Sequence, residues 1–308
     1  MSYPERTYFQ YLPVGSSNME WEWYITGAGV THVEAGEVYP PPGHPGTYDF
    51  KWEKGRILPE YQIFFLSQGE GTFESSQMGE VDIYAGDAVL LFPGLWHRYR
   101  PNRDTGWRDH WISWNGEYLY RLAKRGHISP ERAVLRTNPL NILLSLHERL
   151  LAMMQDYPGE SSRVLAAMGM ELLATIIESA EEKPVQPAAR RVQQQRAVED
   201  KVVTDAMQHI WTHGYRRASG IEQLLEHLPV TRRTLERRFR AALGCSVGEE
   251  FVRCRVERAK HLLSNTKIPI EHIALAVGFS NSGRLRKAFQ QSEKTTPSAY
   301  RKKFIKDK

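Results

Sequence analysis

Cysteine is scarce in this sequence, and its two cysteines, Cys245 and Cys254, do not have the spacing of a zinc site. They are also too few for a disulfide framework, so both are expected to be reduced, partly buried thiols. No apolar run reaches the roughly 18 residues that a membrane helix needs. Residues 1–6 lack the basic and apolar segments of a signal peptide. These absences predict a cytoplasmic protein that does not contact a membrane.

Acidic residues outnumber basic ones in the N-terminal two thirds of the chain but not in the C-terminal third. Residues 200–308 contain 22 Lys or Arg against 11 Asp or Glu, a net charge of +11, whereas the rest has 19 against 25, a net of −6. A chain of 308 residues is long enough for two domains with separate cores. The uneven charge predicts that only the C-terminal part contacts a polyanion. A basic surface that is merely solvated would have the same composition.

The C-terminal part repeats one helix-turn-helix pattern. Leu235 and Phe239 of the first copy recur as Leu285 and Phe289, each fifty positions later. Such a motif needs an apolar first helix, a tight turn and a second helix anchored by apolar residues four apart. The outer face of that second helix can then enter a DNA major groove. One copy could be any helical hairpin, but two basic copies in tandem predict DNA binding.

The part before residue 200 changes its pattern once. Up to about residue 115, short apolar segments such as 61–66 and 87–92 alternate with Gly and Pro, which is typical of a β-sandwich or barrel. From residue 138 apolar residues recur at helical spacing in two segments, which predicts an α-hairpin that packs on the β-domain, forms a dimer seam, or does both. A polar segment with prolines then predicts a linker. The expected divisions are 1–137 for ligand sensing, 138–182 for the hairpin and dimerisation, 183–199 for the linker, and 200–308 for DNA binding.

Four C-terminal segments carry further motifs: TRRTLERRF at 231–239, ERAKHLL at 257–263, IALAVGF at 273–279 and TPSAYR at 296–301. Together they resemble the DNA-binding domain of the AraC/XylS family of bacterial transcription regulators, and the resemblance covers residues 200–301. The sequence departs from the family pattern at four positions, which affects local packing and operator preference: Leu225 replaces a small Ala, Pro229 a frequent Gly, Arg284 a common aromatic residue and Lys294 a common Gly.

The resemblance implies which side chains contact DNA. Arg can pair bidentately with guanine, and Glu can accept from cytosine. Base-contacting positions of the family fall on Arg233, Glu236 and Arg237 of the first recognition helix, and Arg232 and Arg240 are expected to contact phosphates. On the second recognition helix the corresponding residues are Ser282, Gly283, Arg286 and Lys287, with Arg284 beside them. Gly283 has no side chain, so this helix is expected to read fewer bases or to approach the backbone closely.

The N-terminal part has a second motif, Gly86-Asp87 followed by LFPGLWHRY at 91–99. It resembles the cupin-like sensor domain that many AraC-type regulators carry. The His-x-His with a later Glu that metal-binding cupins have is absent from residues 64–73. His97 alone cannot build a site of three or four ligands, so a metal-free pocket without a cofactor is expected. The expected fold is a cupin-like β-barrel or sandwich with an α-hairpin, followed by an all-α domain with two helix-turn-helix units.

Resemblance to the arabinose-type sensor places Tyr99, Asp109 and Trp111 at pocket positions, with Arg56 near a basic ligand contact and His97 as a further contact. Asp109 and Trp111 are two positions apart on an expected strand and so share a face. An aromatic ring can stack on a sugar while polar groups bind its hydroxyls. Aromatic residues are also ordinary core residues, as we expect for Trp107 and Trp114. A small hydroxyl-rich effector such as a monosaccharide is the hypothesis, against a barrel filled by its own side chains.

These observations predict a transcription regulator rather than an enzyme. It would be a homodimer that binds double-stranded promoter DNA, responds to a small molecule, and contacts RNA polymerase if it is an activator. Two alternatives remain open: a metal-free cupin enzyme, and a ligand-independent DNA-binding protein whose β-domain only dimerises. The sequence leaves open the effector, the operator and the sign of regulation.

Overall fold

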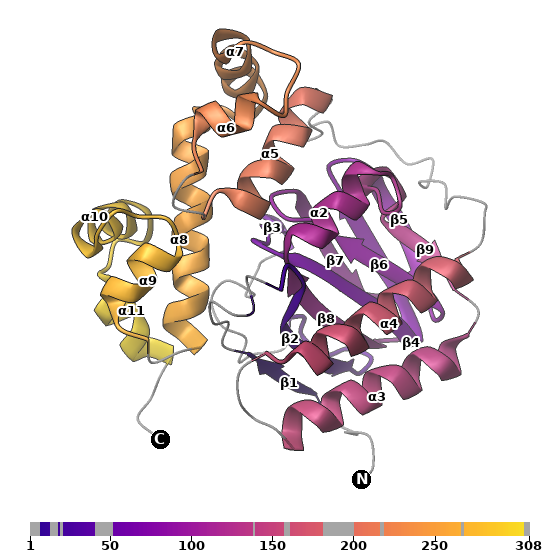
Figure 1. Ribbon diagram of the computed structural model, residues 1–308. Helices are drawn as coiled ribbons and strands as arrows, with labels where there is room; N and C mark the ends of the chain where they lie inside the picture. The colour runs from indigo at the N-terminus through magenta and orange to yellow at the C-terminus, as the bar shows by residue number, and fades with distance from the viewer. Residues whose placement is uncertain are drawn as a thin grey trace.

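The computed structural model describes residues 7–12, 18, 21–40, 52–137, 139–156, 161–180, 200–215, 219–265 and 268–304. A β-rich N-terminal part packs against a helical C-terminal part (Figure 1). The expected linker at residues 183–199 lies outside the described residues. In the part of the chain that the structure describes, no helix is long and apolar enough to cross a membrane.

The strands form one sheet that folds over on itself into two layers. One layer has the order β1-β2-β8-β4-β6-β9, and the other joins β3, β7, β4 and β5. All of the pairings between these strands are antiparallel, as in a barrel or sandwich of short strands. The strands are β1 (Tyr8–Tyr11), β2 (Tyr24–Val33), β3 (Arg56–Ile57), β4 (Tyr61–Ser75), β5 (Gly79–Tyr84), β6 (Asp87–Leu91), β7 (Trp96–Pro101), β8 (Trp107–Asn115) and β9 (Val134–Arg136).

Strand β4 belongs to both layers. Its first half pairs with β6 and β8, and its second half pairs with β5 and β7. Residues 61–66 are all buried because side chains cover both faces there, whereas burial alternates beyond Glu70, where one face is open. Gly69 lies between the halves with φ 77°, and a Cβ there would come 2.1 Å from the Gly106 carbonyl oxygen. Glycine is therefore required at the point where β4 changes partners.

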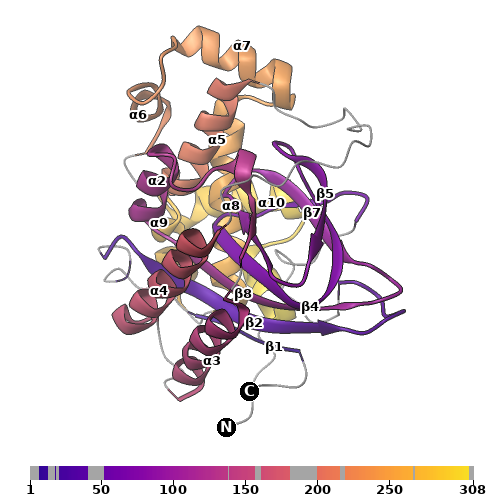
Figure 2. The same ribbon diagram turned by 90° about the vertical axis from the view of Figure 1, so that its right-hand side faces the viewer.

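The predicted α-hairpin is present as α3 (Leu140–Asp156) and α4 (Arg163–Ser179). Figures 1 and 2 show both helices running alongside the sheet. Trp23 Nε1 donates to the Ala166 carbonyl (2.6 Å), and His147 Nε2 donates to the Trp111 carbonyl (3.2 Å). Part of the apolar stripe therefore packs on the β-domain, as one of the two expectations had it.

The C-terminal part is helical, as predicted, and both recognition helices begin at polar caps. The Thr231 side chain accepts from the Thr234 amide at the start of α7, and Asn281 accepts from the Arg284 amide at the start of α10. The helices are α5 (Lys201–His213), α6 (Ile221–Leu225), α7 (Arg232–Leu243), α8 (Val247–Asn265), α9 (Ile270–Ala276), α10 (Ser282–Glu293) and α11 (Pro297–Phe304).

The two recognition helices end in the same backbone conformation with different residues. Gly244 follows α7 with φ 71°, and Lys294 follows α10 with φ 56°. A left-handed conformation is easy for glycine but costs other residues about 1–2 kcal/mol. The departure of Lys294 from the family's glycine therefore introduces local strain and leaves the helix end unchanged.

Helix α8 connects two hydrophobic cores. Its first half, with Phe251 and Cys254, joins a cluster that also contains the core of the β-domain and the buried residues of α5, α6 and α7. Its second half, with Val256 and Leu263, joins a separate cluster with α9, α10 and α11. The first helix-turn-helix unit therefore shares a core with the barrel, whereas the second has its own.

Helix α2 (Glu117–Lys124) and strand β9 were not predicted individually. Leu119 is the only buried residue that this short helix contributes. The helix nevertheless lies against α5 of the C-terminal part, as Figure 2 shows.

Candidate functional site

Helices α7 and α10 turn their apolar residues inward, as predicted. Leu235 and Phe239 of α7, and Leu285 and Phe289 of α10, have no exposed surface. In Figure 1, α7 lies beyond one end of α8, and α10 lies beside α8. Each follows a shorter helix, α6 or α9, so both copies of the repeat have the order that a helix-turn-helix requires.

The outer faces of these helices present most of the predicted DNA contacts. The exception on α10 is Ser282, which is half-buried. Arg232 pairs with Glu222 at 3.2 Å, and because both side chains are well exposed the pair contributes little to stability. It therefore does not hold Arg232 away from a phosphate. The exposed residues among the predicted DNA contacts are Arg232, Arg233, Arg237, Arg240, Gly283, Arg284, Arg286 and Lys287.

Glu236 is arranged differently from its neighbours. It is half-buried, and its carboxylate accepts from the Val247 amide in the first turn of α8 (3.4 Å). Free amides at a helix N-terminus attract anions. In this arrangement the carboxylate is used within the domain, so a contact with cytosine would require it to leave Val247.

The predicted pocket residues converge inside the barrel. Asp109 and Trp111 do share a face of β8, and Trp107 lies on the same face, with its ring 6.1 Å from that of Tyr99. His110 points the other way and stacks on Phe65 at 4.9 Å. Trp107 and Trp114 are buried, at 3% and 0% exposure, as expected of core residues.

Arg56 is the centre of this polar group. Its guanidinium donates to the Tyr99 hydroxyl, to His97 Nε2 (3.4 Å) and to Gln62 Oε1 (3.5 Å). His97 Nδ1 lies 3.1 Å from the Leu95 carbonyl, so that nitrogen carries the proton and Nε2 accepts. Burial, with Arg56 adding to it, lowers the pKa of His97 to about 3. His97 is therefore a neutral residue that orients Arg56.

Asp109 is a carboxyl group with 5% of its surface exposed. Its partner across the β2–β8 pairing is Thr31, which is also buried. Burial raises the pKa of Asp109 from 3.8 to about 7, although Thr31 and Arg56 act in the opposite direction. Near neutral pH this group is thus divided between an acid that donates and a carboxylate that accepts hydrogen bonds.

Asp109→Asn is expected to change how stability depends on pH. Between about pH 4 and 7 the folded protein keeps the Asp109 proton that the unfolded chain releases, so this group's contribution to stability falls as pH rises. From pH 5 to 7 the unfolding free energy of the wild type should drop by about 2–3 kcal/mol relative to Asp109→Asn. Urea unfolding at several pH values measures this. The control is Asp104→Asn, an exposed site; parallel wild-type and Asp109→Asn curves would contradict the assignment.

Trp111 connects the barrel interior to the C-terminal part. Its ring lies 5.6 Å from the ring of Tyr11 on β1. Tyr11 in turn meets His261 of α8 edge to face at 6.1 Å. Three aromatic side chains therefore lead from the predicted pocket to the helix that joins both helix-turn-helix units.

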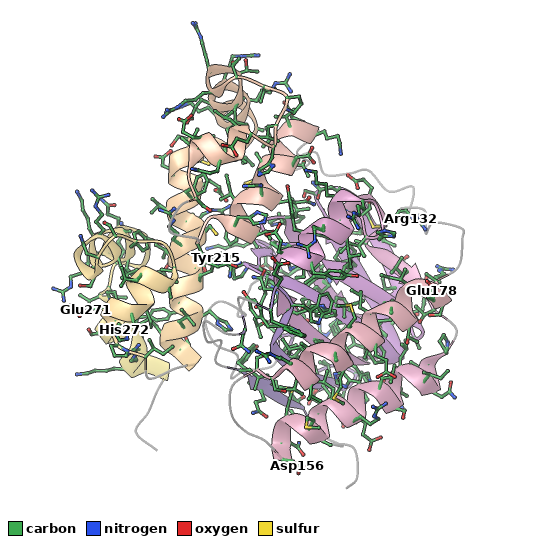
Figure 3. All side chains as sticks on the ribbon, viewed as in Figure 1. Arg132, Asp156, Glu178, Tyr215, Glu271 and His272 are labelled. Carbon is green, nitrogen blue, oxygen red and sulfur yellow. The ribbon has the colours of Figure 1, made fainter. Side chains whose placement is uncertain are left out.

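Further contacts between the two parts surround this path. Glu117 and Tyr120 of α2 meet His213 of α5, with 2.8 Å between Glu117 Oε2 and His213 Nε2. Arg258 donates to the Pro59 carbonyl (3.0 Å) and stacks on Tyr215 at 4.0 Å. Figure 3 shows Tyr215 where the helices meet the barrel. Sequence reasoning selected none of these residues.

A close contact between the parts lies at Gly94, in the turn between β6 and β7. Gly94 has φ 76°, and a Cβ there would lie 2.4 Å from Trp211 Cδ1. Trp211 is fully buried and donates from Nε1 to Glu250 (2.6 Å), which holds its ring beside Gly94.

The described residues hold no group of three or more His, Cys, Asp or Glu placed to bind a metal ion. Both cysteines are free, Cys254 buried and Cys245 partly buried. Burial raises the pKa of the Cys254 thiol to about 11, so this thiol is unsuited to ligating a metal or acting as a nucleophile.

Comparison with known proteins agrees with both halves of this description. Residues 47–177 match the model of an AraC-like ligand binding domain, and residues 224–303 match that of a helix-turn-helix domain. Similar curated proteins include the lactose operon transcription activator of Staphylococcus xylosus, 27% identical over 80% of this chain and 86% of that protein. The Msm operon regulatory protein of Streptococcus mutans is 26% identical with the same coverage. The arabinose operon regulatory protein of Salmonella typhimurium is 25% identical over 89% of this chain and 92% of that protein.

A sensor barrel joined to two recognition helices defines a ligand-controlled, DNA-binding transcription regulator. The two matched domains together span more than half of the chain. The chain belongs to the AraC family of these regulators.

Proposed function

We propose that the effector of this regulator is a sugar bound inside the barrel. The observation that carries the proposal is the convergence of Arg56, Asp109 and Trp111 on the barrel interior. A guanidinium and a buried carboxyl group form strong, charge-assisted hydrogen bonds with hydroxyls, and an indole offers an apolar face. The names of the relatives support a sugar, since two of them regulate the lactose and arabinose operons.

The proposed DNA contacts follow from exposure. Arg233 and Arg237 on α7, and Arg286 and Lys287 on α10, present free side chains to bases, and Arg284 lies beside them. The remaining positions support them: Arg232 and Arg240 bind phosphates, Ser282 and Gly283 bring α10 close to the backbone, and Glu236 contributes once it leaves Val247.

The partners are proposed on similar grounds. A homodimer would form through the α3–α4 hairpin, because Ile142 and Val164 remain 48% and 55% exposed there. The relatives' names describe transcription regulators, one of them an activator, which supports a non-enzymatic protein of the cytoplasm that contacts RNA polymerase when it activates. The four expected divisions, 1–137, 138–182, 183–199 and 200–308, are retained in this proposal.

The control mechanism follows the path from Trp111 through Tyr11 to His261. A ligand changes activity only if it binds two arrangements of the protein with different affinities. A sugar stacked on Trp111 would alter the position that Tyr11 can occupy, and Tyr11 touches α8. The arrangement of α7 and α10 would thereby depend on whether the barrel is filled.

Titration of candidate sugars, followed by tryptophan fluorescence and thermal stability, tests the proposal. At least one sugar should stabilise the wild type, and Trp111→Ala should weaken its binding by about tenfold or more. Trp21→Ala, which removes a 52% exposed tryptophan outside the barrel, is the matched control. If no sugar stabilises the wild type, or if Trp111→Ala binds as tightly, the sugar hypothesis is wrong.

A further inference from the structure

A second concave surface lies on the outside of the β-domain. It is a groove of about 570 Å³ over strands β5, β4 and β7, bordered by the segment that follows β2. None of the five predicted pocket residues lines it. Its lining includes three aromatic side chains and an excess of carboxylates, which the proposed function so far leaves unused.

Strand register places the floor of the groove. Glu70 lies opposite Tyr84, and Thr72 lies between Asp82 on β5 and Arg100 on β7. The intervening residues of β4 are buried, so these side chains project from the outer face. The floor is therefore a row of hydrogen-bonding groups on three adjacent strands.

Aromatic rings stand at three places along the groove. Tyr84 is 45% exposed. Trp52 is held by two guanidinium groups, at 4.3 Å from Arg98 and 3.9 Å from Arg100. Ordered aromatic rings beside polar side chains suit ligands that have both apolar faces and hydroxyls.

Tyr39 links the groove to the barrel interior. It lines the groove, and its ring also lies 6.2 Å from that of Tyr99 and 5.6 Å from that of Trp107 inside the barrel. A ligand that reached from the interior past Tyr39 would enter the groove directly.

Charge limits what the groove can hold. Four carboxylates line it, Glu34, Glu37, Glu70 and Asp82, against the guanidinium groups of Arg100 and Arg103. The net negative charge disfavours phosphorylated or other anionic ligands. Carboxylates accept hydrogen bonds from hydroxyls, which favours a neutral, hydroxyl-rich ligand.

We infer that the effector is a neutral oligosaccharide of about two or three units, whose further units lie in the groove beyond Tyr39. A groove of about 570 Å³ is of the size that holds a drug-sized molecule and exceeds one sugar ring. The inference rests on the proposed sugar effector and specifies its class.

Binding of two nested sugar series to the full-length protein tests it: galactose, melibiose and raffinose, and glucose, maltose and maltotriose. In at least one series the disaccharide or trisaccharide should bind about tenfold more tightly than the monosaccharide, as one or two added hydrogen bonds would produce. Tyr84→Ala should remove most of that gain and leave the monosaccharide affinity unchanged. Tyr118→Ala, at a partly exposed tyrosine on α2 outside the groove, is the matched control and should keep the gain.

Each other result has a separate meaning. Equal affinities for short and long sugars, or a gain that survives in Tyr84→Ala, would overturn the groove inference while the sugar pocket stands. Absence of binding by all six sugars would overturn the sugar pocket, and the groove inference with it. Melting temperatures of both variants establish that they are folded.

Discussion

Gly94→Ala should uncouple effector binding in the barrel from DNA binding by the C-terminal part. The added methyl group would overlap Trp211, which is fully buried and fixed by Glu250. Left-handed backbone costs alanine about 1–2 kcal/mol, and overpacking a filled core adds about 1–3 kcal/mol. We expect a lower melting temperature and a DNA affinity that the effector no longer changes. Thermal unfolding and DNA titrations with and without effector measure both.

Gly126→Ala distinguishes the cost of left-handed backbone from the cost of overlap with Trp211. Gly126 has φ 81°, close to that of Gly94, but no heavy atom of the described residues lies within 4 Å of its Cβ position. This variant should therefore show only the backbone cost and keep its effector response. If Gly94→Ala unfolds at the same temperature as Gly126→Ala and still responds to effector, Gly94 does not hold the two parts in contact.

Arg237→Ala should reduce discrimination between operator and scrambled DNA by about 1–3 kcal/mol, the value of a bidentate base contact. Arg237 is exposed on the outer face of α7 and forms no ion pair with the other described residues. Phosphate contacts are indifferent to sequence. The measurement is affinity for both DNAs at one salt concentration, since counterion release changes affinity with salt.

Arg240→Ala is the matched control, because Arg240 is also exposed on α7 and is proposed to bind phosphate. Arg240→Ala should weaken binding to operator and to scrambled DNA by a similar factor. If Arg237→Ala instead loses the same affinity for both DNAs, Arg237 contacts phosphate and not a base.

The predictions that held depend on local periodicity. The spacing of Leu235 and Phe239, and of Leu285 and Phe289, determines which faces of α7 and α10 are buried, and no distant partner is needed for that. The alternation of β8 likewise placed Asp109 and Trp111 on one face. In both cases one element's own pattern carries the information.

The contacts that sequence reasoning missed join distant segments. Glu117 meets His213 across 96 positions, and Arg258 meets Pro59 across 199. No local pattern indicates such partners. Glu236 differs for a nearer reason: the start of α8 lies close to its side chain and offers a free amide. The short turn between α7 and α8 was a signal that could have indicated it.

The division of the two cores has a consequence for how effector binding spreads through the molecule. A ligand at a hundred times its dissociation constant adds about 2.7 kcal/mol to the stability of whatever must unfold to release it. Because α5, α6 and α7 share the barrel's core, amides there should gain protection from hydrogen exchange when the barrel is filled. Helices α9, α10 and α11 have their own core and can open without the barrel, so their exchange should stay nearly constant. The two recognition helices are thus unequal in local stability: hydrogen exchange in α7 follows the state of the sensor, whereas exchange in α10 is governed by its own core.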